Sequence, residues 1–110
     1  MQISVRHLAK TSIFDVSGDV DFANSPVIRR SLLSEIQVSR TPRVLLNLSK
    51  VRYIDSSGIA SLVEALKASR EIGSRFILFG LGDSPREALQ LSRLNKVFEV
   101  YDNEVQALAS

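Results

Sequence analysis

The chain has 110 residues, of which 45% are hydrophobic and 24% are charged, a composition typical of one globular domain. It contains no cysteine, which excludes disulfides, thiolate metal centres and thiol nucleophiles and favours a cytoplasmic setting. The net charge is only +2 and tryptophan is absent, so the sequence lacks the clustered basic and aromatic residues that direct nucleic-acid binding requires.

The apolar runs are short. The longest have about four residues, as in Phe76–Phe79, whereas a membrane-spanning helix needs about 20. The first residues have a strand-like pattern and lack the basic segment, apolar block and small-residue cleavage site of a signal peptide. We therefore expect neither membrane insertion nor export.

The chain opens with a predicted hairpin. Apolar residues alternate at period two in residues 3–5 and again in residues 13–16, on either side of a turn at residues 9–11. Residues 18–23 then have the composition of a turn that leaves the second strand.

A helix and a central strand are predicted next. Ser25 is a candidate N-cap and Pro26 would take the first helical position of an amphipathic helix over residues 26–38. Residues 44–48 form a nearly continuous apolar run, which is typical of a strand covered on both faces.

The second half alternates helices and strands. Apolar residues spaced i, i+3, i+4 and i+7 predict a helix over residues 57–71, and Gly73 separates it from a strand at residues 75–79. Ser84 to Glu87 resemble a capping box with Pro85 at the first helical position, which predicts a third helix to residue 94. A strand at residues 97–100 and a short terminal helix capped by Asp102 complete the series.

This alternation gives the element order β-β-α-β-α-β-α-β-α. The expected fold is therefore α/β, with a mixed, mainly parallel sheet packed with helices. We expect residues 1–110 to form a single domain.

Few side chains could support catalysis. His7 is the only histidine, and it lies in the first predicted strand, so a Ser-His-Asp arrangement would have to be built from the far N-terminus. Gly80 and Gly82 follow a strand, but Pro85 occupies the position of the third glycine in a dinucleotide-binding fingerprint. We therefore expect a protein without catalytic residues, bound cofactor or metal.

The segment from Asp55 to Gly58 lies at a strand-to-helix junction. Free amides and the helix dipole favour negative charge there, so a phosphate on Ser56 or Ser57 could be accommodated. Asp and Ser are also the commonest N-caps, and by composition alone an ordinary cap is the more frequent explanation of this tetrapeptide. Gly58 costs about 1 kcal/mol relative to alanine within a helix, which indicates close approach of another backbone or of a partner.

Three segments resemble STAS domains, in particular the stand-alone anti-sigma factor antagonists. The stretch from Val51 to Ile59 resembles the signature of this family, with Asp-Ser-Ser-Gly at its centre. The stretch from Gly18 to Pro26 resembles the upstream Gly-x-Leu-Asp element, and the stretch from Arg93 to Phe98 resembles the usual tail. The likeness covers nearly the whole chain.

The resemblance implies a phosphorylation-switched binding module. Ser56 would be phosphorylated by a serine kinase that is itself an anti-sigma factor, and a serine phosphatase would reverse the modification. The unmodified domain, a monomer or weak dimer, would bind that kinase and free the sigma factor. Asp21 and Asp55 match the acidic neighbours of the acceptor, and Ser57, Gly58 and Ile59 begin the docking helix.

The sequence departs from the family pattern at two places. Asn24 stands where threonine is common, and residues 81–85 are not the usual lead into the third helix. The second departure leaves the identity of the partner open.

Two alternatives use the same residues. In a STAS subunit of a lipid-transport ABC complex, the same helix would bind the ATPase and Ser56 would be a contact. In a receiver-like domain, Asp55 would be phosphorylated and Asp19 and Asp21 would hold Mg²⁺. The receiver-like alternative needs a lysine at the end of the last strand, yet Lys96 precedes that strand.

Overall fold

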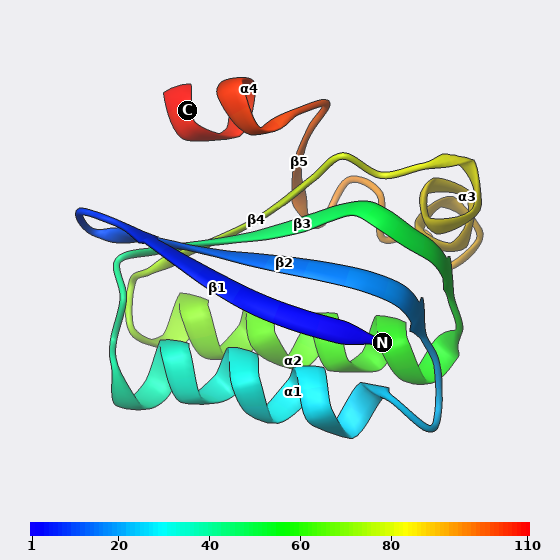
Figure 1. Cartoon of the computed structure of the whole chain (residues 1–110), viewed down its shortest axis with the longest axis horizontal. Coiled ribbons are helices and arrows are strands. Elements are labelled where there is room, and N and C mark those ends of the chain that lie inside the picture. The colour runs from blue at the N-terminus through cyan, green and yellow to red at the C-terminus, as the bar shows by residue number, and fades with distance from the viewer.

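A five-stranded sheet organises the chain in the computed structural model, which describes residues 1–110 (Figure 1). The first two strands pair antiparallel and every later pair is parallel. The predicted class and element order are confirmed. In their order across the sheet, the strands are β1 (Gln2–Leu8), β2 (Thr11–Val20), β3 (Arg43–Ile54), β4 (Arg75–Phe79) and β5 (Glu99–Tyr101).

Helices cover the two faces of the sheet unequally. The long helix α2 (Ser56–Glu71) lies beside α1 (Ser25–Leu33) below the sheet in Figure 1, and a π-helical turn (Ser34–Val38) continues α1. The short α4 (Glu104–Ala109) lies above the sheet, and α3 (Asp83–Leu91) lies at the end where the parallel strands finish. No helix has the length and apolar character needed to span a membrane.

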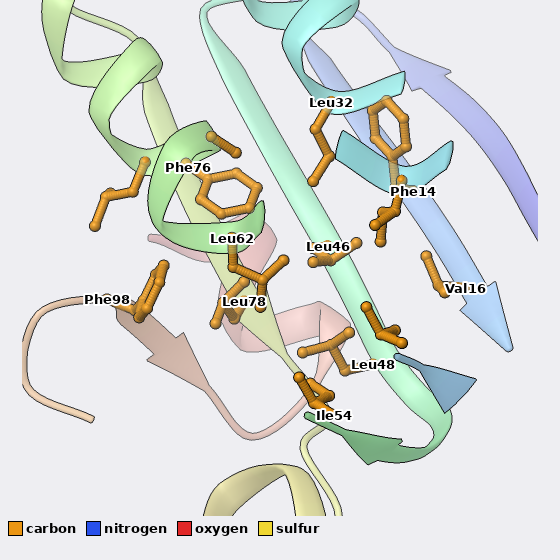
Figure 2. Packing of buried hydrophobic residues seen from close by; sticks show 14 of the residues in the cluster. Phe14, Val16, Leu32, Leu46, Leu48, Ile54, Leu62, Phe76, Leu78 and Phe98 are labelled. Carbon is orange, nitrogen blue, oxygen red and sulfur yellow. The ribbon is translucent and has the colours of Figure 1, made fainter. Parts of the chain in front are cut away.

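The main core fills the space between the sheet and the α1–α2 layer. In Figure 2, Phe14 of β2 lies beside Leu32 of α1, and Leu78 of β4 lies beside Leu62 of α2. A smaller cluster, which includes Leu45 and is covered by α4, lies on the opposite face. Successive residues of a strand point to opposite faces, so β3 is buried on both sides, as its apolar run predicts.

The strands β2 and β3 are longer than the predicted ones. Residues 18–20 belong to β2 rather than to a turn, and β3 continues to Ile54, which pairs with Val20. Two register shifts interrupt this pairing, one between Asp15 and Ser17 and one between Gly18 and Asp19. The hydrogen-bonded ladder therefore extends the strands into polar sequence that has no apolar alternation.

The helix starts also differ from the predictions. Asn24, not Ser25, is the N-cap of α1, and it makes no capping side-chain bond. Asn103, not Asp102, caps α4 by accepting a hydrogen bond from the Gln106 amide at 2.9 Å.

The third helix begins earlier than the predicted capping box. The Gly82 carbonyl accepts a hydrogen bond from the Arg86 amide at 3.1 Å, so Gly82 is the N-cap and Ser84 lies within the first turn. Pro85 lacks an amide hydrogen, which leaves one donor fewer to cap. The helix ends at Leu91 rather than at residue 94, and β5 begins only at Glu99.

Candidate functional site

The residues predicted to form a site meet at one end of the sheet. Because β2 and β3 are parallel, both end there, and the β2–α1 loop lies beside the β3–α2 junction (right-hand side of Figure 1). Asp21 belongs to the loop, whereas the stretch from Asp55 to Ile59 covers the junction and the first turn of α2.

Asp55 joins the two segments. Its Oδ1 accepts a hydrogen bond from the Gly58 amide at 3.0 Å, which caps α2. Its Oδ2 accepts one from the Phe22 amide at 2.9 Å, across a separation of 33 residues in sequence. Its own amide donates to the Val20 carbonyl at 3.2 Å. Asp55 is therefore an N-cap that also fixes the position of the neighbouring loop.

Gly58 occupies the place where α2 meets the end of β2. A Cβ at this position would overlap the Val20 carbonyl oxygen and would lie 2.8 Å from the Ile54 Cγ2. Close approach of another backbone, one of the two explanations that the sequence offered, accounts for the glycine. Any part of Gly58 in partner binding stays a prediction.

The other residues of the first turn differ in exposure. Ser56 is exposed, and no other side chain or backbone group of the chain hydrogen-bonds its hydroxyl. Ser57 is half-buried, and its carbonyl accepts a hydrogen bond from the Ser61 hydroxyl at 3.1 Å. Ile59 is only 7% exposed and packs into the main core. Of the predicted residues on α2, Ser56 therefore offers the most accessible side chain.

Asp21 and Asp19 shape the loop. The Asp21 Oδ1 accepts a hydrogen bond from the Asn24 amide at 3.0 Å, and its carbonyl accepts one from the Ser25 amide at 2.7 Å. The side chain of Asn24 donates to the Asp19 carbonyl at 3.1 Å, and the Asp19 carboxylate pairs with Arg52 at 3.3 Å. Asp19, Asp21 and Asp55 do not converge into a cluster that could hold a metal ion.

A groove of about 480 Å³ lies between the N-terminal halves of α1 and α2, and Ser57, the residue after Ser56, lines it. An Arg29–Glu64 ion pair joins the two helices at this groove. Sequence reasoning missed the groove and missed Phe22, whose side chain is 79% exposed. The α2 residues that line the groove are spaced i, i+3, i+4 and i+7 in the sequence. This spacing, which places them on one face of the helix, was the signal from which the face could have been predicted. The lining residues are Phe22, Ala23, Ser25, Pro26, Arg29, Ser57, Ala60, Ser61 and Glu64.

The only histidine lies at the other end of the sheet, near the hairpin turn. Its Nδ1 lies 3.1 Å from the Ser12 hydroxyl, which donates to the Glu35 carboxylate at 2.8 Å. The hydroxyl therefore stands between the imidazole and the carboxylate, whereas in a Ser-His-Asp triad the imidazole takes the middle place. These contacts tie β1 and β2 to the π-helical turn.

A larger hollow of about 850 Å³ lies over β1, β2 and β3. Arg6 borders it and donates to Asp15 at 2.6 Å and to Glu104 at 2.5 Å, which links α4 to the hairpin. Hydrogen bonding to the Arg6 guanidinium lowers the pKa of the Asp15 carboxyl below its usual value. The charges around this hollow are thus largely paired within the chain.

The family of the chain follows from its match to known proteins. The family model of the STAS domain matches residues 2–107. The chain belongs to the STAS domain family. The resemblance carried by the Asp-Ser-Ser-Gly segment is thereby confirmed, and this segment forms the strand-to-helix junction of the STAS domain described above.

The chain is similar to a curated protein and to solved structures over nearly its whole length. An anti-sigma F factor antagonist of Paenibacillus polymyxa is 28% identical over 98% of this chain and 92% of its own length. The crystal structure of an anti-sigma factor antagonist from Mycobacterium paratuberculosis matches with a TM-score of 0.87 at 22% identity, covering 98% of this chain and 91% of that one. A sulfate transporter family protein from Wolinella succinogenes matches with a TM-score of 0.79 at 21% identity, over 93% and 84% of the two chains. The two structures show a shared fold alone.

Proposed function

We propose that this STAS domain is an anti-sigma factor antagonist whose binding is switched by phosphorylation of Ser56. Unmodified, it binds an anti-sigma factor that is also a serine kinase, and a sigma factor is freed. Phosphorylation releases the kinase and a serine phosphatase restores the binding form. Residues 1–110 act as one cytoplasmic binding module, not as an enzyme. The observation that carries the proposal is the exposed, unbonded Ser56 hydroxyl at the start of α2, next to the Asp55 cap.

The amides of the first turn support Ser56 as the acceptor. The Gly58 amide is taken by the Asp55 carboxylate and the Ile59 amide by the Asp55 carbonyl. The amides of Ser56 and Ser57 have no partner within the chain, and they lie at the positive end of the helix dipole. A phosphate on Ser56 can therefore be held without displacing an existing hydrogen bond.

Repulsion between the phosphate and nearby carboxylates explains why phosphorylation would release the kinase. A phosphate adds a charge of about −1.5 to −2 next to Asp55 and near Asp21. At a separation of about 7 Å and an effective dielectric constant of about 20, each pair of unit charges costs roughly 2.4 kcal/mol. If half of that cost arises only when a partner excludes water, binding weakens by about tenfold. The surface needs no large rearrangement.

The alternative that the sequence left open is a STAS subunit of a lipid-transport ABC complex. In that case the surface of α2 would bind an ATPase permanently and Ser56 would be a structural contact. The receiver-like alternative is less well supported, since both carboxylate oxygens of Asp55 already accept hydrogen bonds from backbone amides.

Phosphorylation mapping tests the acceptor. The protein is incubated with its cognate kinase and Mg-ATP, and the modified peptide is identified by mass spectrometry. We expect one phosphoryl group on Ser56, none in Ser56→Ala, and normal labelling of the matched control Ser57→Ala. Phosphoserine withstands hydroxylamine, whereas an aspartyl phosphate does not. Label lost on hydroxylamine treatment, or retained in Ser56→Ala, would contradict the proposal.

A further inference from the structure

Phe22 has an unusual position for a large apolar residue. Its side chain is 79% exposed, although it lies directly beside the first turn of α2. We propose that Phe22 is the anchor of partner binding: its ring enters an apolar pocket of the kinase, and the groove beside it receives an apolar side chain of the kinase. This inference rests on the proposed function and specifies the chemistry of its partner.

Hydrogen bonds hold the loop around Phe22 in place. The Phe22 amide donates to the Asp55 Oδ2 at 2.9 Å, and the following turn is closed by Asp21 and Asn24. The Asn24 side chain adds a bond to the Asp19 carbonyl at 3.1 Å. A fixed backbone loses little conformational freedom on binding, and aromatic residues, phenylalanine among them, are enriched in the buried cores of protein interfaces.

The groove next to Phe22 is suited to an apolar side chain. Ala23 and Pro26 line it from the side of α1, and Ala60 lines it from α2. The charged residues at the groove, Arg29 and Glu64, are paired with each other. An apolar side chain entering the groove would therefore leave no buried charge unpaired.

The charges around the anchor favour a protein of different sequence as the occupant. Arg52 is paired with Asp19, and the carboxylates of Asp21 and Asp55 accept hydrogen bonds only from backbone amides, so no basic side chain neutralises either of them. Nucleic acid and anionic membranes would be repelled by them. A second copy that docked its own Phe22 loop here about a nearby twofold axis would bring the same carboxylates together.

The anchor and the switch share Asp55. One of its carboxylate oxygens accepts a hydrogen bond from the Phe22 amide and so positions the Phe22 backbone. The proposed acceptor, Ser56, is the next residue in the chain. A partner that buries the Phe22 ring thus covers the region around Ser56 and excludes water from a phosphate placed there. The anchor accordingly increases the effect of the phosphate on affinity.

The test is calorimetric titration with the purified kinase that phosphorylates Ser56. We expect Phe22→Ala to weaken binding at least tenfold and Phe22→Leu to be intermediate. Val38→Ala, which removes a side chain of equal exposure (78%) from the π-helical turn, should stay within twofold of wild type. The thermal melting of all variants should match that of wild type, because Phe22 adds little to the core.

The possible outcomes separate the inference from the proposed function. If no kinase phosphorylates Ser56, the proposed function fails and the inference fails with it. If the kinase binds wild type and Phe22→Ala equally, the anchor is refuted and the proposed function stands. Sedimentation supplies a third outcome, since self-association that Phe22→Ala abolishes would identify a second copy as the occupant and overturn the inference.

Discussion

Gly58 and Asp55 determine the geometry of the candidate site at the scale of single residues. Gly58 lets α2 approach the carbonyl of Val20, which is the last residue of β2. Asp55 uses its two carboxylate oxygens to cap α2 and to hold the Phe22 amide. The exposed Ser56 hydroxyl is therefore carried by a junction whose neighbours are fixed by packing and by hydrogen bonds.

Alanine at position 58 should destabilise the protein. Helix propensity alone would favour alanine by about 1 kcal/mol. The added methyl group, however, would collide with the Val20 carbonyl and lie 2.8 Å from the Ile54 Cγ2. We expect the free energy of unfolding to fall by about 1–3 kcal/mol, as is usual for overpacking. Urea denaturation measures this change.

Gly82→Ala is the matched control for that substitution. Gly82 has a φ of −74°, and nothing lies within 4 Å of an added Cβ. Because Gly82 is the N-cap of α3, where alanine is disfavoured, its replacement should lower the free energy of unfolding by at most about 1 kcal/mol, without the collision expected at position 58. A Gly58→Ala protein as stable as the Gly82→Ala protein would show that the close approach to Val20 is not maintained.

At the scale of elements, ion pairs join neighbouring strands of the sheet. Arg6 of β1 pairs with Asp15 of β2 at 2.6 Å, and Arg75 of β4 pairs with Glu99 of β5 at 2.5 Å. Hydrogen bonds from these guanidinium groups lower the pKa of both carboxyls below their usual values of 3.8 and 4.5. The charged forms are thus favoured in the folded state.

The lowered pKa values predict how stability depends on pH. The stabilisation is complete above the usual carboxyl pKa and is lost as pH falls through the lower pKa of the folded state. Because both pairs are partly exposed, we expect about 0.2–1 kcal/mol from each. Urea unfolding between pH 6 and pH 3 should therefore show a smaller acid-induced loss in the double variant Asp15→Asn, Glu99→Gln. An identical loss in the double variant and wild type would contradict this assignment.

The elements themselves were predictable where apolar periodicity was strong. The strand at residues 75–79 was predicted with its observed bounds, and α2 begins one residue before the predicted start. Prediction failed where backbone hydrogen bonds, and not the apolar pattern, determined the ends. The pairing of Val20 with Ile54 extends two strands into polar sequence, and the Gly82 carbonyl starts α3 ahead of Ser84.

The parallel sheet explains the location of the site at the scale of the whole molecule. It carries the β2–α1 loop and the β3–α2 junction to the same end, so Asp21 and Ser56 were predictable as neighbours from topology (Figure 1). The exposure of Phe22 and the groove beside it were not predictable. Both depend on how two helices that are distant in sequence approach each other.

The proposed switch acts on a preformed surface. The hydrogen bonds of Asp55 and Asp21 already fix the loop and the helix start, so phosphorylation changes the charge of the surface rather than its shape. The central claim is that Ser56 acts through charge. This claim predicts different affinities for two variants at position 56, one that removes the hydroxyl and one that adds a carboxylate.

Calorimetric titration of wild type, Ser56→Ala and Ser56→Asp against the isolated kinase tests that claim most directly, with circular dichroism to establish that all three proteins are folded. We predict that Ser56→Ala binds like wild type, because the exposed hydroxyl has no hydrogen bond to lose. Ser56→Asp should bind more weakly by roughly 1–3 kcal/mol, since it adds like charge beside Asp55. Binding of Ser56→Ala more than tenfold weaker than wild type, with Ser56→Asp no weaker than Ser56→Ala, would contradict the switch and favour a permanent structural contact.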